Sequence, residues 1–184
     1  LRPRAPHPAS PPVLRSRHRN AVRRAARGGL LLSALAGSAL PACRDVVVPL
    51  ENPAATTFAP ALNVNLAAPG VVRTSSGLYY QDLATGSGEV ADSGKTVRVF
   101  YAGWLTNGRQ FDTNRENNRP LEFALGTGAV IRGWDEGLRG MRVGGRRRLI
   151  VPPSLGYGAR TSGRIPAGSV LVFEVDLVSI ATPQ

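Results

Sequence analysis

Hydrophobic and polar positions alternate with a period of two near the C-terminal end of the chain. There Leu171, Phe173 and Val175 are separated by polar positions that include Glu174 and Asp176. A period of two places successive side chains on opposite faces of a strand, so one face is buried and the other is solvated. The pattern therefore predicts a half-buried strand that runs from about Val170 to Ile180.

Other segments are expected to be strands for similar reasons. Asn107-Gly108 is a strong hairpin signal because both residues accept the positive φ that a tight turn requires. It follows a long apolar and polar segment and precedes Gln110, where the return strand begins. The expected strands are residues 78–83, 96–105, 110–112, 121–125 and 146–151.

One short segment has helical spacing instead. Val130, Ile131, Trp134 and Leu138 fall on one side of a helix, and Gly140 is a typical stop signal. The chain is therefore expected to be α+β, with an antiparallel sheet and one short helix packed on it.

The net charge of +11 is concentrated at the N-terminus. Residues 1–42 contain eight Arg and no acidic residue, which leaves about +3 for the rest, an ordinary value for a globular domain. The distribution argues against nucleic-acid binding, and the run Arg146-Arg147-Arg148 is expected to be a solvated strand face. The single cysteine, Cys43, excludes an intramolecular disulfide and a cysteine-based metal cluster.

The N-terminal region has the order of an export signal. An Arg-rich stretch precedes the apolar run Gly28–Leu40, and Pro41-Ala42-Cys43 follows it. The run is about 13 residues long, which is too short to span a hydrocarbon core of ~30 Å as a helix. Residues 1–42 are therefore expected to be a leader that is removed on export, and Arg23-Arg24 leaves a twin-arginine signal open.

The end of this signal resembles a bacterial lipobox, Leu40-Pro41-Ala42-Cys43. In such signals the cysteine is lipidated, and several acyl chains anchor the protein stably to a membrane. The alternative is an ordinary signal peptide cut after Ala42, which leaves Cys43 as a free thiol. We expect an exported protein, periplasmic or otherwise extracytoplasmic, anchored through lipid on Cys43.

The remaining chain divides by composition. Residues 43–73 carry four prolines and no sustained period, so they are expected to form an extended linker to the lipid, although Val46-Val47-Val48 and Phe58 could pack on another part of the protein. Residues 74–184 carry the strand and helix patterns and are expected to form the folded domain.

Several motifs within this domain occur in a specific order. They are Tyr-x-Gly, Gly-x-x-Phe-Asp, Val-Ile-x-Gly-Trp, Leu-Gly-Tyr-Gly, Ile-Pro and Leu-x-Phe-x-Val-x-Leu. In this order they resemble the FKBP family of peptidyl-prolyl cis-trans isomerases, over about residues 78–180. The resemblance implies a strongly twisted antiparallel sheet of five or six strands, wrapped around one short helix.

The resemblance also implies a pocket between helix and sheet. Trp134 would be the floor on which a prolyl ring sits, and Asp112 would be the polar group beside it. Tyr157 would direct its hydroxyl at a substrate carbonyl, and the backbone N–H of Ile131 would meet another carbonyl. The catalytic set would be Asp112, Tyr157, Trp134 and Phe173, and the substrate-binding set Tyr101, Phe111, Leu121, Val130, Ile131 and Ile165.

Three features depart from the best-known members of this family. Asn117 stands where an Arg often pairs with the Asp, and Leu121 replaces a Phe at the pocket edge. The loop Arg160–Arg164 is shorter by one residue. These differences concern the rim and the affinity of the pocket more than its centre.

Each site residue taken alone also fits a structural role. Trp134 suits a core, Asp112 a turn or cap, and Tyr157 a surface loop. Together they predict an isomerase of X–Pro bonds that needs no cofactor and no metal. Its partners would be proline-containing unfolded or exported polypeptides, with macrolides as inhibitors, and the protein would be a monomer.

Two other functions remain open at this stage. One is a non-catalytic chaperone module of the same fold that binds clients, although no large insertion is evident between the strands. The other is a degenerate domain kept as a structural part of an envelope complex, against which the complete set of pocket residues argues.

Overall fold

The structure is a computed structural model, and it describes residues 52–181. The leader 1–42 and the expected lipidation site Cys43 lie outside these residues, so their roles stay predictions. No helix within the described part of the chain is both long and apolar enough to cross a membrane.

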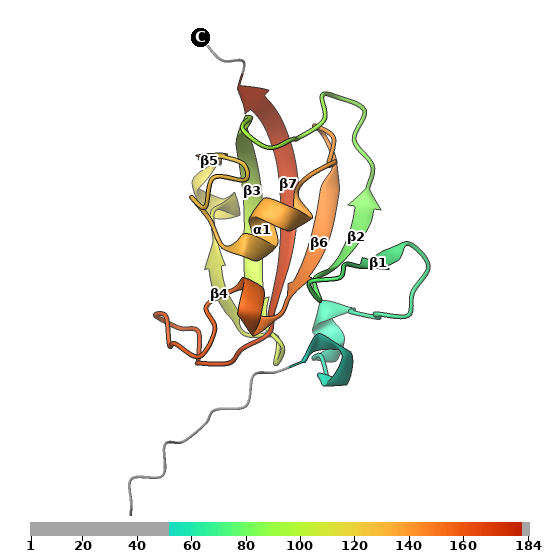
Figure 1. The fold of residues 1–184 in the computed structure, drawn as a ribbon, viewed down its shortest axis with the longest axis vertical. Coiled ribbons are helices and arrows are strands. Elements are labelled where there is room, and N and C mark those ends of the chain that lie inside the picture. The colour runs from blue at the N-terminus through green and yellow to red at the C-terminus, as the bar shows by residue number, and fades with distance from the viewer. Residues whose placement is uncertain (1–51, 182–184) are drawn as a thin grey trace, which may run out of the picture. The chain divides into compact units, whose positions relative to one another are not determined.

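One antiparallel sheet of seven strands dominates the structure (Figure 1). Six strands pair in the order β1-β2-β6-β7-β3-β4, and β5 pairs with β3 beside β4. The strands are β1 (Val71–Arg73), β2 (Tyr79–Ala84), β3 (Thr96–Leu105), β4 (Gln110–Thr113), β5 (Leu121–Ala124), β6 (Arg146–Val151) and β7 (Leu171–Ala181). The α+β class and the positions of six strands agree with the sequence pattern. The seventh strand is β1, which lies in the segment expected to be a linker.

The single α-helix among the described residues, α1 (Arg132–Gly137), lies across the sheet between β5 and β6 (Figure 1). It begins at Arg132 because Ile131 is extended, with φ −60° and ψ 147°. The helix packs very closely on β6. A Cβ atom added to Gly133 would lie 2.5 Å from Cγ1 of Val151, so a larger residue at this position would push the helix off the sheet.

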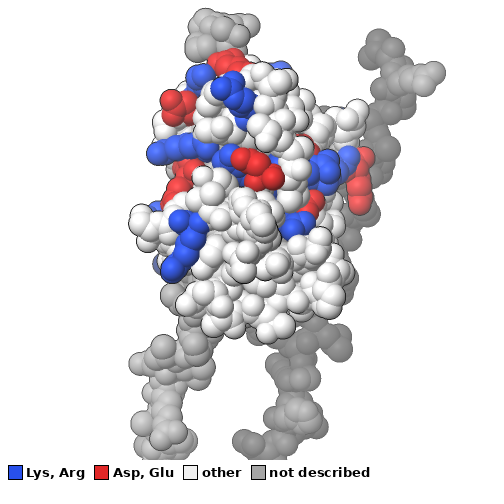
Figure 2. All heavy atoms as spheres, turned by 90° about the vertical axis from the view of Figure 1, so that its right-hand side faces the viewer, with Lys and Arg blue, Asp and Glu red and all other residues white. Residues whose placement is uncertain are grey.

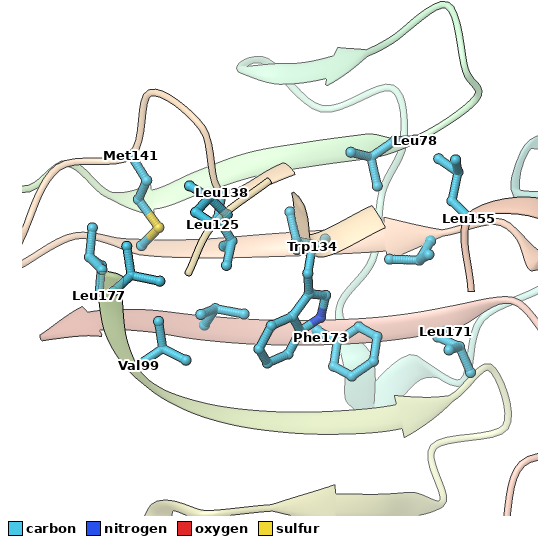
Figure 3. Packing of buried hydrophobic residues seen from close by; sticks show 14 of the residues in the cluster. Leu78, Val99, Leu125, Trp134, Leu138, Met141, Leu155, Leu171, Phe173 and Leu177 are labelled. Atoms are coloured by element: carbon cyan, nitrogen blue, oxygen red, sulfur yellow. The ribbon is translucent and has the colours of Figure 1, made fainter. Parts of the chain in front are cut away.

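The hydrophobic core fills the space between α1 and the facing side of the sheet (Figure 3). Trp134 lies at its centre beside Phe173, with Val99 and Leu177 toward one end and Leu171 toward the other. This is the buried face that the alternation of β7 predicts, and it gives the helix one defined position on the sheet.

The segment before β2 is part of the folded unit rather than an extended tether. Phe58, Val64, Leu66 and Val71 pack on a second, smaller cluster of Tyr79, Ile150 and Val170. Two short 3-10 helices, Pro53–Ala55 and Pro60–Leu62, precede β1, and β1 pairs with β2. The folded unit therefore begins before Thr74, the expected start of the domain. Within residues 52–73, apolar side chains that are isolated in the sequence pack on the sheet.

The arginines of β6 are paired rather than freely solvated. The register of β6 and β7 places Arg146 opposite Asp176 and Arg148 opposite Glu174, and both couples form ion pairs. The Arg148 side chain is only 11% exposed. On the side of the molecule shown in Figure 2, basic and acidic side chains likewise lie among one another.

For Arg147 the prediction of a solvated strand face is wrong. Its side chain points to the helix side of the sheet and is 7% exposed. It forms a bidentate pair with Asp82 at 2.7 and 3.0 Å and donates to the carbonyls of Gly137 and Arg139. These carbonyls lie at the C-terminal end of α1, where helical carbonyls lack intrahelical partners. Arg147 therefore fixes the end of the helix to the sheet.

Candidate functional site

Aromatic rings from three strands gather around Trp134, which lies on the helix α1. The ring of Tyr101 on β3 lies edge-on to Trp134 with centroids 5.0 Å apart, and the ring of Phe173 on β7 does so at 5.3 Å. Phe111 on β4 contacts Phe173 edge-on at 5.5 Å. Edge-to-face pairs at these distances are favourable because the positive ring edge meets the negative ring face. The four rings pack into a box-shaped cluster that lines a cavity on one side.

This box is the base of a cavity of about 210 Å³, which we call the aromatic pocket. Trp134 is 3% exposed and Phe173 4% exposed, so they form its deep part, whereas Leu121 and Tyr157 are each 39% exposed and form its rim. The lining residues are Tyr101, Phe111, Asp112, Leu121, Ala129, Val130, Ile131, Trp134, Tyr157 and Phe173.

The structure brings together nearly all of the residues that the sequence indicated. Nine of the ten predicted pocket residues line the aromatic pocket, and Ile165 lies beside it. Ile165 is buried and lines a neighbouring cavity of about 220 Å³. We call this the loop cavity; its lining residues are Phe111, Asp112, Tyr157, Ser162, Gly163, Arg164 and Ile165. Ala129 is an additional lining residue, and its place directly before Val130 is the signal that could have found it.

The polar group of the aromatic pocket is a hydrogen-bonded pair. The hydroxyl of Tyr101 donates to Oδ2 of Asp112 at 2.6 Å. Burial raises the pKa of Tyr101 well above its usual value, and the hydrogen bond to Asp112 and the negative charge there raise it further. Tyr101 is therefore a neutral donor at every physiological pH, and it holds the Asp112 carboxylate against the pocket wall.

A close approach of backbone and rings makes room for this arrangement. Gly103 on β3 lies opposite both Asp112 on β4 and Phe173 on β7. A Cβ atom there would lie 2.7 Å from the Phe111 ring and 2.8 Å from the Phe173 ring. Only glycine therefore lets these two rings meet over the strand. Gly103 is the glycine of the Tyr-x-Gly motif.

Asn114 positions Tyr101, and the sequence pattern does not single it out. Its Oδ1 accepts the N–H of Tyr101 at 2.8 Å, and its Nδ2 donates to the carbonyls of Val99 and Arg119 at 3.0 and 3.1 Å. The residue is buried at 9% exposure. A polar residue after a short strand is ordinarily a turn residue, so only the tertiary structure shows that Asn114 ties the loop after β4 to the middle of β3.

The turn that leads into α1 is held by a second residue that the sequence analysis did not select. The carboxylate of Asp135 accepts the N–H of Gly126 at 2.7 Å and that of Gly128 at 2.9 Å. This fixes the segment that carries Val130 and Ile131 into the pocket wall. Within the described residues, the N–H of Ile131 is a donor in none of the hydrogen bonds found, so it is available to an incoming carbonyl.

The site has the chemistry of a recess for a small apolar ring beside an amide. Its walls are aromatic and aliphatic, its deep part is buried, and its polar groups are hydroxyls, one backbone N–H and a carboxylate. Such a recess suits the binding and distortion of a peptide group more than a nucleophilic attack, because the lining hydroxyl that is bonded to a carboxylate, that of Tyr101, has a raised pKa and is therefore not an activated nucleophile.

Comparisons with known proteins agree with this description. The model of the family FKBP-type peptidyl-prolyl cis-trans isomerase matches residues 88–178, which include every predicted pocket residue. The chain is 47% identical over 105 residues to an FK506-binding protein of Neisseria meningitidis serogroup B, which covers 56% of this chain and 96% of that protein.

Two solved structures share the fold. FkpA from Escherichia coli superposes with a TM-score of 0.57 at 40% identity, over 62% of this chain and 53% of that chain. A peptidyl-prolyl cis-trans isomerase from Pseudomonas syringae superposes with a TM-score of 0.57 at 34% identity, over 64% of this chain and 85% of that chain. The chain thus spans about half the length of FkpA and most of the other two.

Proposed function

Because the chain belongs to the family of FKBP-type peptidyl-prolyl cis-trans isomerases, we propose that its folded unit accelerates the cis–trans isomerisation of X–Pro bonds. The observation that carries this proposal is the aromatic pocket, in which Trp134 lies beneath an apolar recess and Asp112 is held at its side by Tyr101. The proposed substrates are proline-containing polypeptides that are not yet folded.

The barrier that such an enzyme must lower comes from amide resonance. Rotation about the peptide bond costs ~18–20 kcal/mol because the twisted amide loses its partial double bond. The uncatalysed reaction of an X–Pro bond takes ~10–100 s. The planar amide is the more charge-separated form, so an apolar recess disfavours it relative to the twisted transition state.

The named residues have separate tasks in this mechanism. Trp134 and Phe173 hold the prolyl ring while the preceding residue rotates. The hydroxyl of Tyr157 and the N–H of Ile131 bind substrate carbonyls. In the twisted amide the carbonyl carbon becomes more electron-poor, so the carboxylate of Asp112 stabilises it electrostatically. No step requires the transfer of a proton or the presence of a metal.

The test is the rate of cis-to-trans conversion of a short Xaa-Pro peptide with the protein and with two variants. Asp112→Ala removes the carboxylate, and Tyr157→Phe removes one hydroxyl with little change in shape. We expect both variants to lower kcat/KM while circular dichroism stays unchanged. Val178→Ala, at an exposed position of β7, is the matched control.

The same experiment distinguishes the isomerase from a second candidate function. A non-catalytic module that binds clients would use the same pocket as a grip. A folded protein that binds a Pro-containing peptide at the aromatic pocket and leaves its isomerisation rate unchanged would replace the enzyme proposal with this one.

The pocket is also proposed to accept a macrolide. The Neisseria relative is named as an FK506-binding protein, and the pocket residues of this chain are of the kind that bury an apolar ring. Leu121 lies at the rim, where the side chain of a Phe would offer a macrolide a larger apolar contact. Competition between FK506 and a Pro-containing peptide, followed by tryptophan fluorescence, tests this proposal.

We further propose that the protein works outside the cytoplasm, anchored by lipid on Cys43. The support is the order of the N-terminal sequence: the Arg-rich stretch, the apolar run Gly28–Leu40, and the cysteine. Mass spectrometry of membrane-extracted protein tests it. A mature N-terminus at an acylated Cys43 is expected, and an unmodified N-terminus, or one elsewhere, contradicts it.

A further inference from the structure

Three segments that are distant in the sequence meet at one end of the folded unit, which we call the hairpin end. They lie together at the lower end of Figure 1: residues 52–70, the turn 104–110 between β3 and β4, and residues 152–170. Hydrogen bonds join them. The N–H of Ala59 donates to the carbonyl of Thr106 at 2.7 Å, and Nη2 of Arg109 donates to the carbonyl of Arg164 at 2.6 Å. The hairpin end is therefore one continuous surface.

Positive charge at the hairpin end is not balanced by acidic residues. The charged residues of its three segments are Arg109, Arg160 and Arg164, and none is Asp or Glu. All three arginines are exposed, and among the ion pairs of the described residues none includes them. Asp112 lines the loop cavity together with Arg164, but its carboxylate accepts a hydrogen bond from Tyr101. The three guanidinium groups are thus free to bind an external anion.

The rest of the described unit has charges of both signs. Every acidic residue that the structure describes lies outside the hairpin end, and several pair with neighbouring arginines, as Glu122 does with Arg98 and Asp176 with Arg146. In Figure 2, basic and acidic side chains lie together in the upper part of the surface, and the lowest part is largely uncharged. The hairpin end is therefore distinct in that its only charges are positive.

The chain also enters the folded unit at this end. Asn52, the first described residue, caps the 3-10 helix Pro53–Ala55, which lies at the lower end of Figure 1. Asn52 follows Cys43 by nine positions. Nine residues span at most ~32 Å even when they are fully extended. A lipid on Cys43 would therefore hold the hairpin end, rather than the opposite end of the sheet, close to a bilayer.

We propose that the hairpin end is a membrane-facing surface, at which Arg109, Arg160 and Arg164 bind the headgroups of anionic phospholipids. This inference rests on the proposed lipid anchor and adds an orientation to it. Acyl chains supply affinity for the bilayer, but they do not determine which side of the protein faces it. The planar guanidinium group presents donors that match phosphate oxygens, and the absence of carboxylates from the three segments leaves these donors unpaired.

The orientation has a consequence for the aromatic pocket. Tyr157 at the rim of the pocket and Arg160 belong to the same loop, and the N–H of Arg160 donates to the carbonyl of Tyr157 at 3.4 Å. The pocket therefore opens beside the membrane-facing surface. A polypeptide that emerges at the bilayer meets the proposed isomerase site at short range.

The test is cosedimentation with lipid vesicles of a chain that begins at residue 43 and carries Cys43→Ser. This chain has no acylation site and lacks the Arg-rich leader, which would itself attract anionic lipid. It keeps the complete folded unit, because both apolar clusters form within residues 52–181. We expect binding to vesicles of phosphatidylglycerol and phosphatidylcholine, and much weaker binding to phosphatidylcholine alone. Binding should be lost at about 1 M salt, where the Debye length is about 3 Å.

Substitutions at the hairpin end should weaken this binding. Each basic residue near an anionic bilayer strengthens binding by a factor of roughly five. The triple variant Arg109→Gln/Arg160→Gln/Arg164→Gln should therefore lower the partition coefficient by roughly 10- to 100-fold. Since Arg109 also braces the loop, Arg160→Gln/Arg164→Gln is measured as well and should show an intermediate loss. Circular dichroism reports whether each variant is folded.

A second triple variant is the matched control. Arg132→Gln/Arg139→Gln/Arg142→Gln removes the same net charge from exposed residues in and after α1. Two of these arginines, Arg132 and Arg139, lie around a cavity that Asp135 and Glu136 also line. At physiological ionic strength, where the Debye length is about 8 Å, charges away from the bilayer contribute little. The control should therefore keep the wild-type partition coefficient within about two-fold.

The outcomes separate this surface from the anchor. Equal losses in the two triple variants, or equal binding to both kinds of vesicle, overturn the membrane-facing surface, whereas the anchor is decided by mass spectrometry of Cys43. If the hairpin end binds anionic vesicles as expected but Cys43 carries no lipid, the proposed anchor fails and the lipid-binding surface stands.

Discussion

The hydroxyl of Tyr101 donates a hydrogen bond of 2.6 Å to Oδ2 of Asp112. The two residues come from neighbouring antiparallel strands, β3 and β4, and their pairing through the Asn107-Gly108 turn brings them together. The bond links the deep aromatic wall to the exposed carboxylate, so the position of the carboxylate depends on a residue that is itself partly buried. The first two predictions follow from this bond.

We expect Tyr101 and Asp112 to act as a unit in catalysis. In a double-mutant cycle, Tyr101→Phe and Asp112→Asn should each lower kcat/KM for an X–Pro peptide, and the double variant should lose less than the sum. The coupling energy should be about 1 kcal/mol, the size of a hydrogen bond in a solvated setting. Additive losses would show that the bond has no part in positioning the carboxylate.

The raised pKa of Tyr101 predicts a loss of stability at high pH. A raised folded-state pKa means that the folded protein keeps this proton when the unfolded chain has lost it. The resulting stabilisation is complete below about pH 10, the ordinary value for tyrosine, and is lost as pH rises above it. The difference in unfolding free energy between the wild type and Tyr101→Phe should therefore shrink above about pH 10 in urea titrations. A difference that grows with pH would contradict this assignment.

Asn114 should matter for stability and for the geometry of the pocket. Asn114→Ala leaves the N–H of Tyr101 and the carbonyl of Val99 without their partner in a part-buried region. Each such group costs about 1–3 kcal/mol, so a loss of roughly 2–3 kcal/mol is expected in denaturant unfolding. Asn117→Ala, at an exposed position of the same loop, is the control and should change stability by less than about 0.5 kcal/mol.

Substitutions of the adjacent residues Arg146 and Arg147 on β6 should lower the free energy of unfolding by clearly different amounts. Arg147→Met leaves Asp82 and two carbonyls at the end of α1 without their partner, whereas Arg146→Met breaks an exposed pair with Asp176. Breaking a buried pair costs about 3–5 kcal/mol. The Asp82 side chain is 40% exposed, so we expect roughly 2–3 kcal/mol for Arg147 and at most about 1 kcal/mol for Arg146. Equal losses in thermal or urea unfolding would overturn the distinction.

The segment before β2 should contribute to stability without contributing to chemistry. Phe58→Ala removes a side chain that packs beside Tyr79 and Ile150, on the cluster apart from the core around Trp134. A loss of roughly 1–3 kcal/mol is expected, below the usual cost of a fully buried Phe because Phe58 is only partly buried. The kcat/KM for an X–Pro peptide should stay at the wild-type value. A drop in kcat/KM with unchanged stability would instead link this segment to the pocket.

The sequence by itself determined six of the seven strands, and the family resemblance in its motifs indicated most of the lining of the aromatic pocket. The alternation in β7 and the Asn107-Gly108 turn are local signals, and the structure has the expected strands at these places. The spacing of Val130, Ile131, Trp134 and Leu138 also predicted a helix, but the helix covers only Arg132–Gly137, so of these four residues Trp134 alone is helical. The ordered motifs contain eight of the ten lining residues of the aromatic pocket, and the family resemblance that they carry added Leu121.

Only the tertiary structure decided where polar and isolated apolar side chains find partners. In the sequence Arg147 cannot be distinguished from Arg146 and Arg148, but in the structure it donates to the carbonyl of Gly137 at the end of α1. Asn114 has the sequence context of a turn residue, but in the structure it accepts the N–H of Tyr101 on β3. Phe58 and Leu66 lie in a proline-rich segment without a period, so the sequence shows that Phe58 could pack but does not show that its partners are on β2 and β6. The physical reason is the same in each case: periodicity reports which face of an element is buried, whereas a hydrogen bond or contact between distant segments depends on which backbone groups the fold brings within about 3 Å of one another.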